Sequence, residues 1–142
     1  MSIVFYEQGS DLVRSELFDK DAKQWAERLV KPIGERKVKG VSRHQFRRLF
    51  EEVKRLQKML INEKRKWAYV KPFVKMLKPK TAYTVARAKD KEKNAGVYYD
   101  ALKDLFNEGI DGVNTERDFR AFCDFLEAVY GYYYELGGVN TK

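Results

Sequence analysis

The fold is decided by residues 42–60, which read SRHQFRRLFEEVKRLQKML. Ser42 can cap the N-terminus of a helix, and Gln45, three residues later, completes a capping box. At about 100° per residue, the apolar side chains that follow share an arc of roughly 120°. They are Phe46, Leu49, Phe50, Val53, Leu56 and Leu60. The stretch therefore predicts an amphipathic helix with one face in a protein core.

Another side of the same helix is basic. A stripe about 60° wide holds four cations, and two arginines lie beyond it. The stripe consists of Arg43, Arg47, Lys54 and Lys58, with Arg48 and Arg55 beyond it. One interpretation is an ordinary solvated surface, because Glu51 and Glu52 can pair locally with Arg55. The charge distribution described below favours the other interpretation, a binding surface.

The chain before Ser42 predicts a helical segment and a linker. We expect a helical segment from about Ser10 to Lys31, interrupted near Asp19 and ended by Pro32-Ile33-Gly34. Lys31 to Gly40 contains two glycines and four bases, so we expect an exposed linker there.

The chain after residue 61 predicts shorter elements. Residues 62–78 form no regular pattern, and Pro72 blocks a continuous helix, so we expect a loop with a short helical turn. Pro79 suits the first residue of a new helix that runs to about Ala88. A further helix is expected from about Ala95 to Gly109.

Thr115 and Asp118 predict a capped start for the last helix, which runs to Leu136. Its apolar arc is about 200° wide, more than one neighbouring layer usually covers. The helix is therefore expected either at the centre of the bundle or partly reserved for another subunit. We expect self-association, as a homodimer or a longer array, through residues at the edges of the arc. These are Tyr132, Tyr134 and Leu136.

No segment alternates β-branched and polar residues over a useful length. The sequence therefore predicts an all-α fold, a compact bundle of about five to six helices with a basic face. At 142 residues the chain fits one domain, residues 1–142. We expect it to comprise an acidic N-terminal helical segment with its linker, residues 1–40, and a helical core, residues 41–138.

The charge of the chain is regional. Of its 29 Lys and Arg residues, 21 lie between Lys31 and Lys93 against six acids, a net charge of +15 there. The flanking segments carry −2 and −5. A block this positive repels itself, and a polyanion relieves the repulsion while releasing counterions. Nucleic acid is therefore the first hypothesis for a partner.

The segment LKPKTAYTVAR, residues 77–87, is the strongest local signal for such a partner. On a helix that starts at Pro79, three side chains fall within about 60° of each other near the N-terminus, which itself favours phosphate. These side chains are Lys80, Tyr83 and Arg87, and Lys78 is a further candidate next to them. The competing interpretation is a solvated surface with Tyr83 in the core. For Trp67 and Tyr69, a buried role is favoured over stacking on bases.

Signals for catalysis and for metal binding are poor. His44 has no nucleophile near it, and Cys123 is best explained as a small core residue. One His and one Cys cannot form a zinc site of the Cys/His kind, so we expect no metal and no cofactor. No apolar run approaches the ~20 residues of a membrane span. We therefore expect a cytoplasmic protein with no membrane contact.

Three segments resemble a known family when taken in order and spacing. They are HQFRRLFEEV (44–53), LKPKTAYTVAR (77–87) and DFRAFCDFLEAV (118–129), followed by Gly137-Gly138. Together they resemble the small helical subunit of type III-A CRISPR effector complexes, the Csm complexes. The resemblance covers about Val41 to Gly138, and the middle segment is its most specific part.

The resemblance implies a non-catalytic subunit of an RNA-guided complex of antiviral defence. Copies of such a subunit line up along crRNA paired with target RNA, beside the other subunits of the complex. This role requires contacts with phosphates and sugars, while base pairing reads the sequence. The alternative hypothesis is a small basic DNA-binding or nucleoid-type regulatory protein that places the Ser42 helix in a groove. The long connection over 62–78 argues against that alternative.

Overall fold

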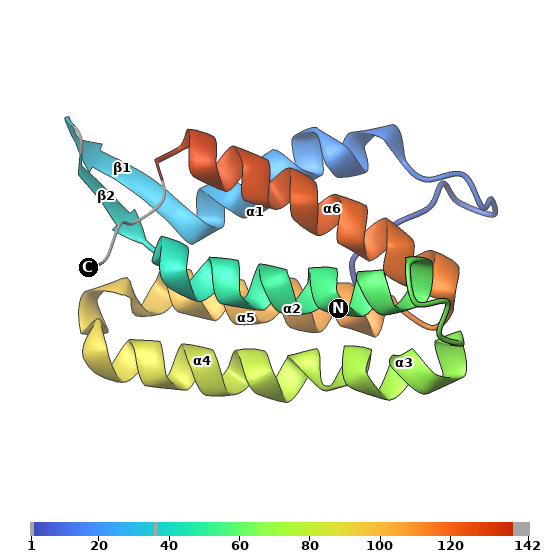
Figure 1. The fold of residues 1–142 in the computed structure, drawn as a ribbon. Coiled ribbons are helices and arrows are strands. Elements are labelled where there is room, and N and C mark those ends of the chain that lie inside the picture. Colours follow the sequence, from blue (N-terminus) through green and yellow to red (C-terminus); the bar gives the residue numbers. More distant parts are fainter. Residues whose placement is uncertain (1, 36, 138–142) are drawn as a thin grey trace.

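The computed structural model describes residues 2–35 and 37–137, which form a helical bundle with one small hairpin (Figure 1). The α-helices of this part of the chain are α1 (Lys20–Leu29), α2 (Arg43–Ile61), α3 (Trp67–Lys75), α4 (Leu77–Lys91), α5 (Gly96–Asp111) and α6 (Glu116–Glu135). The other elements are the 3₁₀ helices η1 (Ser15–Phe18) and η2 (Lys93–Ala95) and the strands β1 (Val30–Gly34) and β2 (Lys37–Gly40). The predicted all-α fold class is confirmed.

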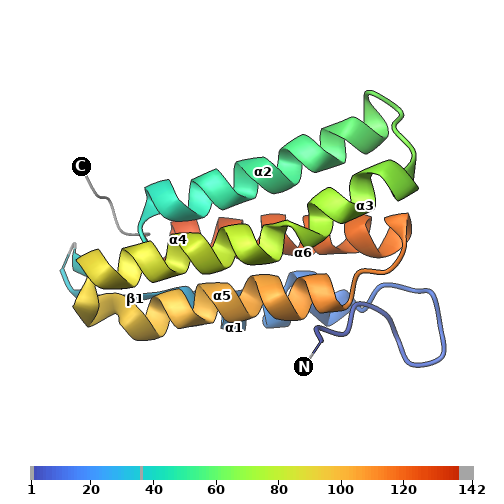
Figure 2. The ribbon, with the colours of Figure 1, turned by 90° about the horizontal axis from the view of Figure 1, so that it is seen from below.

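The helices are arranged around one core. α3 and α4 follow each other along one edge of the bundle, and α1 and α6 lie along the opposite edge (Figure 1). From below, α2 and α5 lie on the two sides of α4 (Figure 2). The buried apolar side chains form one cluster, from Phe5 near the N-terminus to Tyr133 in α6. That residues 1–142 are one domain stays a prediction.

Helix α2 begins at the predicted cap, but the predicted capping box is incomplete, because the Ser42 backbone N–H donates to the Tyr99 hydroxyl at 3.1 Å and not to the Gln45 side chain. The Ser42 hydroxyl oxygen accepts a hydrogen bond from the Gln45 backbone N–H at 3.2 Å, which satisfies one free donor of the first turn. All but one of the predicted core residues are buried, and the exception, Phe50, stacks on Tyr130 with ring centroids 4.4 Å apart. The buried ones are Phe46, Leu49, Val53, Leu56 and Leu60.

The neighbouring elements of the bundle cover most of the wide apolar arc of helix α6. Its predicted cap is confirmed, because Thr115 and Asp118 form a complete capping box. The helix packs against α1, α2 and α5. A tight contact joins α5 to α6 at Gly109, where an added Cβ would lie 2.3 Å from a ring carbon of Phe122. Gly109 therefore serves packing inside α5, which ends at Asp111 rather than at Gly109.

The predicted linker from Lys31 to Gly40 is wrong, because this segment forms an antiparallel hairpin. β1 pairs with β2 so that Val30 lies opposite Gly40 and Lys31 opposite Lys39. Gly40 has a φ of 148°, and a Cβ there would lie 2.2 Å from the Leu29 carbonyl oxygen, so only glycine fits. The strands are too short for a visible alternation of polar and apolar residues.

The first helical segment is also shorter than predicted. The chain from Tyr6 to Val13 makes a turn closed by an isolated antiparallel bridge between these two residues. The 3₁₀ helix η1 follows, and α1 begins only at Lys20. The predicted interruption near Asp19 therefore coincides with the junction between η1 and α1.

The predicted loop over 62–78 is wrong as well, since α3 occupies most of it and α4 begins at Leu77. Pro72 lies inside α3 and removes one helical hydrogen bond. Burial of Val70 and Val74 offsets that loss, since a buried valine contributes roughly 1.5 kcal/mol or more. Tertiary packing thus overrides the helix-breaking residue.

Trp67 ties the start of α3 to the core, as predicted. Its indole N–H donates to the Asn114 carbonyl oxygen at 3.2 Å, and its ring centroid lies 5.8 Å from that of Phe119. Tyr69, by contrast, is exposed, with the Arg65 guanidinium 4.8 Å from its ring centroid.

Candidate nucleic-acid interface

A groove lies between α2 and α4, and it gathers several of the residues that the sequence predicts for RNA binding. It encloses about 240 Å³. Its lining residues are Arg48, Leu49 and Glu52 of α2 and Lys80, Tyr83 and Thr84 of α4. We call it the α2–α4 groove. Leu49 is buried, whereas the two cations and the phenol are exposed.

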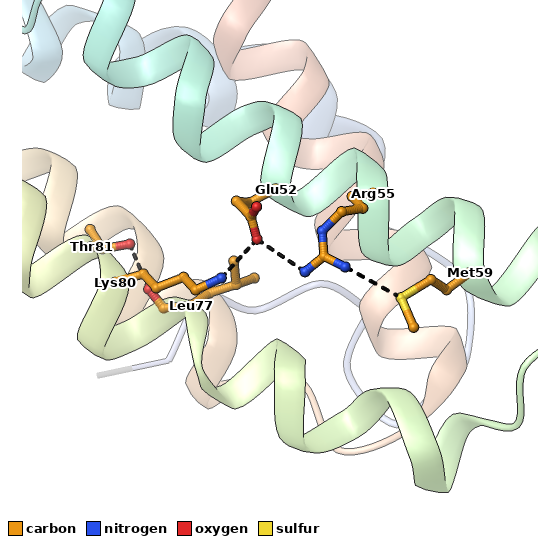
Figure 3. A network of polar contacts seen from close by, with 6 residues as sticks. All are labelled: Glu52, Arg55, Met59, Leu77, Lys80 and Thr81. Carbon is orange, nitrogen blue, oxygen red and sulfur yellow. Dashed lines mark hydrogen bonds and ion pairs between the residues drawn. The ribbon is translucent and has the colours of Figure 1, made fainter.

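One carboxylate, Glu52, holds two of the candidate cations beside this groove (Figure 3). Its Oε2 atom accepts hydrogen bonds from Lys80 Nζ at 2.9 Å and from Arg55 Nη2 at 3.2 Å. The hydrogen bond from Lys80 is the main cause that lowers the pKa of Glu52 from its ordinary value of 4.5. Glu52 is therefore ionised at neutral pH and lies where two cations converge.

The hydroxyl of Thr81 lies on the core side of α4, where a hydrogen bond within the helix satisfies it. It is buried and donates to the Leu77 carbonyl oxygen at 2.7 Å (Figure 3). Because Thr81 faces the core, its neighbours at Lys80 and Tyr83 face away from it. Tyr83 is 63% exposed, so the interpretation that places it in the core is wrong. Arg87 Nη1 donates to the Tyr83 hydroxyl at 3.1 Å, which keeps both side chains together.

The other predicted cations divide between paired and unpaired side chains. Three of them form ion pairs within the chain, and these pairs are Arg47 with Glu51, Lys54 with Glu127, and Lys78 with Asp111. In residues 2–35 and 37–137, Arg48 and Lys58 have no acidic partner within 4.0 Å. Exposed pairs are weak, so all of these cations remain available to phosphate.

Arg43 lies apart from the groove, at the C-terminal end of α6. Its Nη2 atom donates to the Gly137 carbonyl oxygen at 2.9 Å, and its guanidinium lies 4.7 Å from the ring centroid of Tyr134. A cation at this end complements the helix dipole of α6. The predicted basic stripe is therefore split, with Arg43 in a structural position.

The residues predicted for self-association already have contacts within the chain. The Tyr132 hydroxyl donates to Asp19 Oδ1 at 2.9 Å, Tyr134 lies against Arg43, and Leu136 is partly buried. Tyr134 remains 38% exposed. Self-association through these residues stays a prediction.

Lys75 is an important residue that sequence reasoning misses. Its Nζ atom donates to the carbonyl oxygens of Ile110 at 3.1 Å and Val113 at 2.8 Å, so it closes the C-terminal end of α5. Burial, followed by repulsion from Lys71 and Lys78, lowers the pKa of this amine. No local pattern distinguishes it from the other lysines of a basic segment.

Residues that could indicate catalysis have structural surroundings. Asp118 accepts hydrogen bonds from the backbone N–H groups of Asn114 and Thr115 and from the Tyr6 hydroxyl, as a helix cap does. Burial raises the pKa of the Cys123 thiol to about 12. Within residues 2–35 and 37–137, no group of three or more His, Cys, Asp or Glu side chains is placed to hold a metal ion.

The fold and the groove define a small helical-bundle protein with a cation-lined surface. The family model described as Csm2 Type III-A matches residues 14–138. The chain therefore belongs to the Csm2 family. It is a small subunit of a type III-A CRISPR Csm complex, which also contains other subunits. The resemblance found in the sequence is confirmed. The match begins at residue 14, so it also includes α1 and the hairpin, which the resemblance over 41–138 leaves out.

No curated protein and no solved structure shows a significant match to the chain. Among the described residues, none of the helices has the length and apolar character that crossing a membrane requires.

Proposed function

We propose that the protein is a cytoplasmic, non-catalytic subunit that binds the backbone of crRNA paired with target RNA through the α2–α4 groove. The observation that carries this proposal is the grouping of Arg48, Lys80 and Arg87 around the exposed ring of Tyr83. The cations supply charge for phosphates, and the ring supplies a surface on which a base or a sugar packs.

Glu52 makes the groove suited to reversible binding. The ion pairs that it forms with Lys80 and Arg55 are partly exposed, and such pairs contribute about 1 kcal/mol or less. A phosphate oxygen can therefore replace the carboxylate as the partner of both cations. Binding then exchanges one anion for another and leaves neither cation unpaired.

Two further considerations support a sequence-independent, structural role. A double-stranded RNA is recognised mostly by shape and by contacts with phosphates and 2′-hydroxyls, because its deep groove is too narrow for side chains to read. Lysine and arginine at an open groove provide such contacts. The Csm2 family is a family of structural subunits of the Csm complex, which supports a role without catalysis.

The test is binding of the full chain to a labelled guide–target RNA duplex at several salt concentrations. We expect the variant Lys80→Gln/Arg87→Gln to bind roughly tenfold more weakly at ~0.1 M salt and to lose about 1–2 from the slope against log salt. The matched control is Lys20→Gln/Lys23→Gln, which removes two exposed cations from α1. Equal losses in both variants, or an unchanged groove variant, contradict the proposal.

The alternative, a DNA-binding regulator, is tested in the same assay. The long connection that argues against it is absent, since α3 follows α2 after residues 62–66. However, α3 exposes Tyr69 and Phe73, which makes it a poor match to a helix that reads bases by hydrogen bonding. Preference for one duplex DNA sequence over RNA would favour the alternative.

A further inference from the structure

The hairpin formed by β1 and β2 projects from one end of the bundle and carries three lysines (Figure 1). Lys31 lies directly opposite Lys39 in the register. Lys37 and Lys39 are two residues apart on β2, so they point to the same face of the strand. Lys31 and Lys37 are exposed, and Lys39 is partly buried.

This arrangement is unfavourable for the isolated chain. Like charges directly opposite each other on two strands destabilise the pair. In the part of the chain that the structure describes, none of these three lysines has an acidic side chain within 4.0 Å. The cations near the α2–α4 groove differ, because Lys80 and Arg55 share Glu52. A bound anion is what would relieve the repulsion on the hairpin.

A cavity joins the hairpin to the end of α4. It encloses about 490 Å³ and is lined by Lys39 of β2 and by Lys91 and Lys93 beside it. Two acids also line it, but Glu92 already accepts a hydrogen bond from the Tyr99 hydroxyl at 2.7 Å. Neither Lys91 nor Lys93 has an acidic partner within 4.0 Å among the described residues.

The cavity and the α2–α4 groove lie at two different points along α4, the groove beside Lys80 and the cavity beside Lys91. Lys80, Arg87 and Lys91 are seven and four residues apart, so at about 100° per residue they lie on one side of the helix. The distance along the axis from Lys80 to Lys91 is about 16 Å at 1.5 Å per residue. One extended chain of phosphates can therefore follow α4 from the groove to the hairpin.

We propose that Lys31, Lys37 and Lys39 of the hairpin, with Lys91 and Lys93, form a second phosphate-binding surface that extends the α2–α4 groove, so that an RNA strand continues past α4 onto the hairpin. This inference rests on the proposed function. A nucleic-acid backbone fits the surface better than a protein does, because lysine is depleted in protein interfaces whereas aromatic side chains, Met and Arg are enriched. Ile33, 57% exposed, is the large apolar side chain exposed on this hairpin among the described residues.

Two structural explanations compete with this assignment. Lysines on an edge strand discourage pairing with other chains, and lysines at the C-terminus of α4 complement its dipole. Both explanations predict that replacing the lysines changes aggregation or stability. Neither predicts a change in the salt dependence of RNA binding, so that dependence separates them from the proposal.

The experiment compares two charge-matched variants of the full chain, Lys31→Gln/Lys37→Gln/Lys39→Gln on the hairpin and Lys20→Gln/Lys23→Gln/Lys103→Gln elsewhere on the surface. A labelled single-stranded RNA of about 20 nucleotides is titrated at salt concentrations from ~50 to ~200 mM. If each hairpin lysine contacts one phosphate, the slope against log salt falls by about 2 and affinity at ~0.1 M salt falls roughly tenfold. The control variant keeps the slope of the wild type.

A lysine footprint with an amine-reactive reagent and mass spectrometry gives a readout on the wild-type chain itself. RNA should protect Lys37 and Lys91 from the reagent and leave Lys20 and Lys23 reactive. Suppose that the wild type binds RNA, that the hairpin variant keeps the wild-type affinity and salt slope, and that Lys37 is not protected. This result overturns the inference and leaves the proposed function standing. A wild type that binds no RNA even at ~50 mM salt overturns both.

Discussion

Helices α4 and α6 both carry tyrosines beside charged residues, yet the fold places them in opposite environments. In α6, Phe122 and Tyr133 are fully buried because α1, α2 and α5 surround that helix. In α4, Tyr83 is 63% exposed and Thr81, a polar residue, is buried instead. The comparison shows that an aromatic residue indicates burial only where enough neighbouring helices surround it. The predictions below test this division, from the largest expected effect to the smallest.

Phe119→Ala should have the largest effect on the free energy of unfolding. The ring is fully buried in α6, so we expect a loss of about 3–5 kcal/mol. Thermal or urea unfolding measures it, and Tyr83→Ala on α4 is the control, with a change within about 0.5 kcal/mol. If Tyr83→Ala proves the more destabilising change, the division between the two helices is inverted.

Gly109→Ala should destabilise the contact between α5 and α6. Its Cβ would lie 2.3 Å from a ring carbon of Phe122, so the ring must move, at a cost of about 1–3 kcal/mol. Gly131→Ala is the matched control, because a Cβ built there meets nothing within 4 Å apart from the local backbone of α6 itself. Inside α6 that change should be neutral or stabilising by up to ~1 kcal/mol, since alanine favours helices. Urea midpoints of the two variants compare both sites.

The double variant Tyr132→Ser/Tyr134→Ser tests self-association. If these residues contact a second copy of the chain, light scattering should show a dimer or longer array for the wild type and a monomer for the variant. The accompanying loss of stability should be small, because the hydrogen bond that Tyr132 loses to Asp19 is exposed to solvent and Tyr134 loses only its contact with Arg43. A wild type that is monomeric at high concentration would mean that burial inside one subunit accounts for the whole arc.

Glu52→Gln should have the smallest effect, and its sign is informative. Removing the carboxylate frees Lys80 and Arg55 for phosphate, so RNA affinity should rise about two- to fivefold. The pKa of Glu52 is lowered in the folded chain, so any stability from its ion pairs is present above 4.5 and is lost as pH falls through the lowered pKa. The difference in thermal midpoint between wild type and variant should therefore close at acid pH. Weaker RNA binding by the variant would mean that Glu52 positions the cations for RNA rather than competing with it.

The sequence predicts the long, well-capped helices well. Ser42 with Gln45 and Thr115 with Asp118 are local signals, and the cap and the apolar period agree in both helices. It fails over residues 31–40 and 62–78, on either side of α2, where tertiary contacts decide the structure. Pro72 breaks the local helical pattern, but burial of its neighbours retains α3.

The candidate site is predictable in composition but not in geometry. Arg48, Lys80, Tyr83 and Arg87 are identified from their spacing on two separate helices. The groove that Arg48, Lys80 and Tyr83 line depends on how α2 packs against α4, and no local sequence pattern indicates that packing. Likewise, the hydrogen bond of Arg43 with Gly137 joins residues 94 positions apart, and sequence periodicity predicts only contacts within one helix or strand.

The buried thiol of Cys123 gives this chain a built-in probe of its own opening. Burial raises the pKa of the thiol to about 12, so at neutral pH almost none of it is the reactive thiolate while the bundle is closed. Since Cys123 is the one cysteine in the sequence, any modification by a thiol reagent reports an event in which α6 separates from its neighbours. The rate of labelling therefore measures the free energy of that opening, in the free subunit and in RNA-bound or assembled states alike. Cysteines placed on the hairpin or on α4 can be labelled selectively without replacing it.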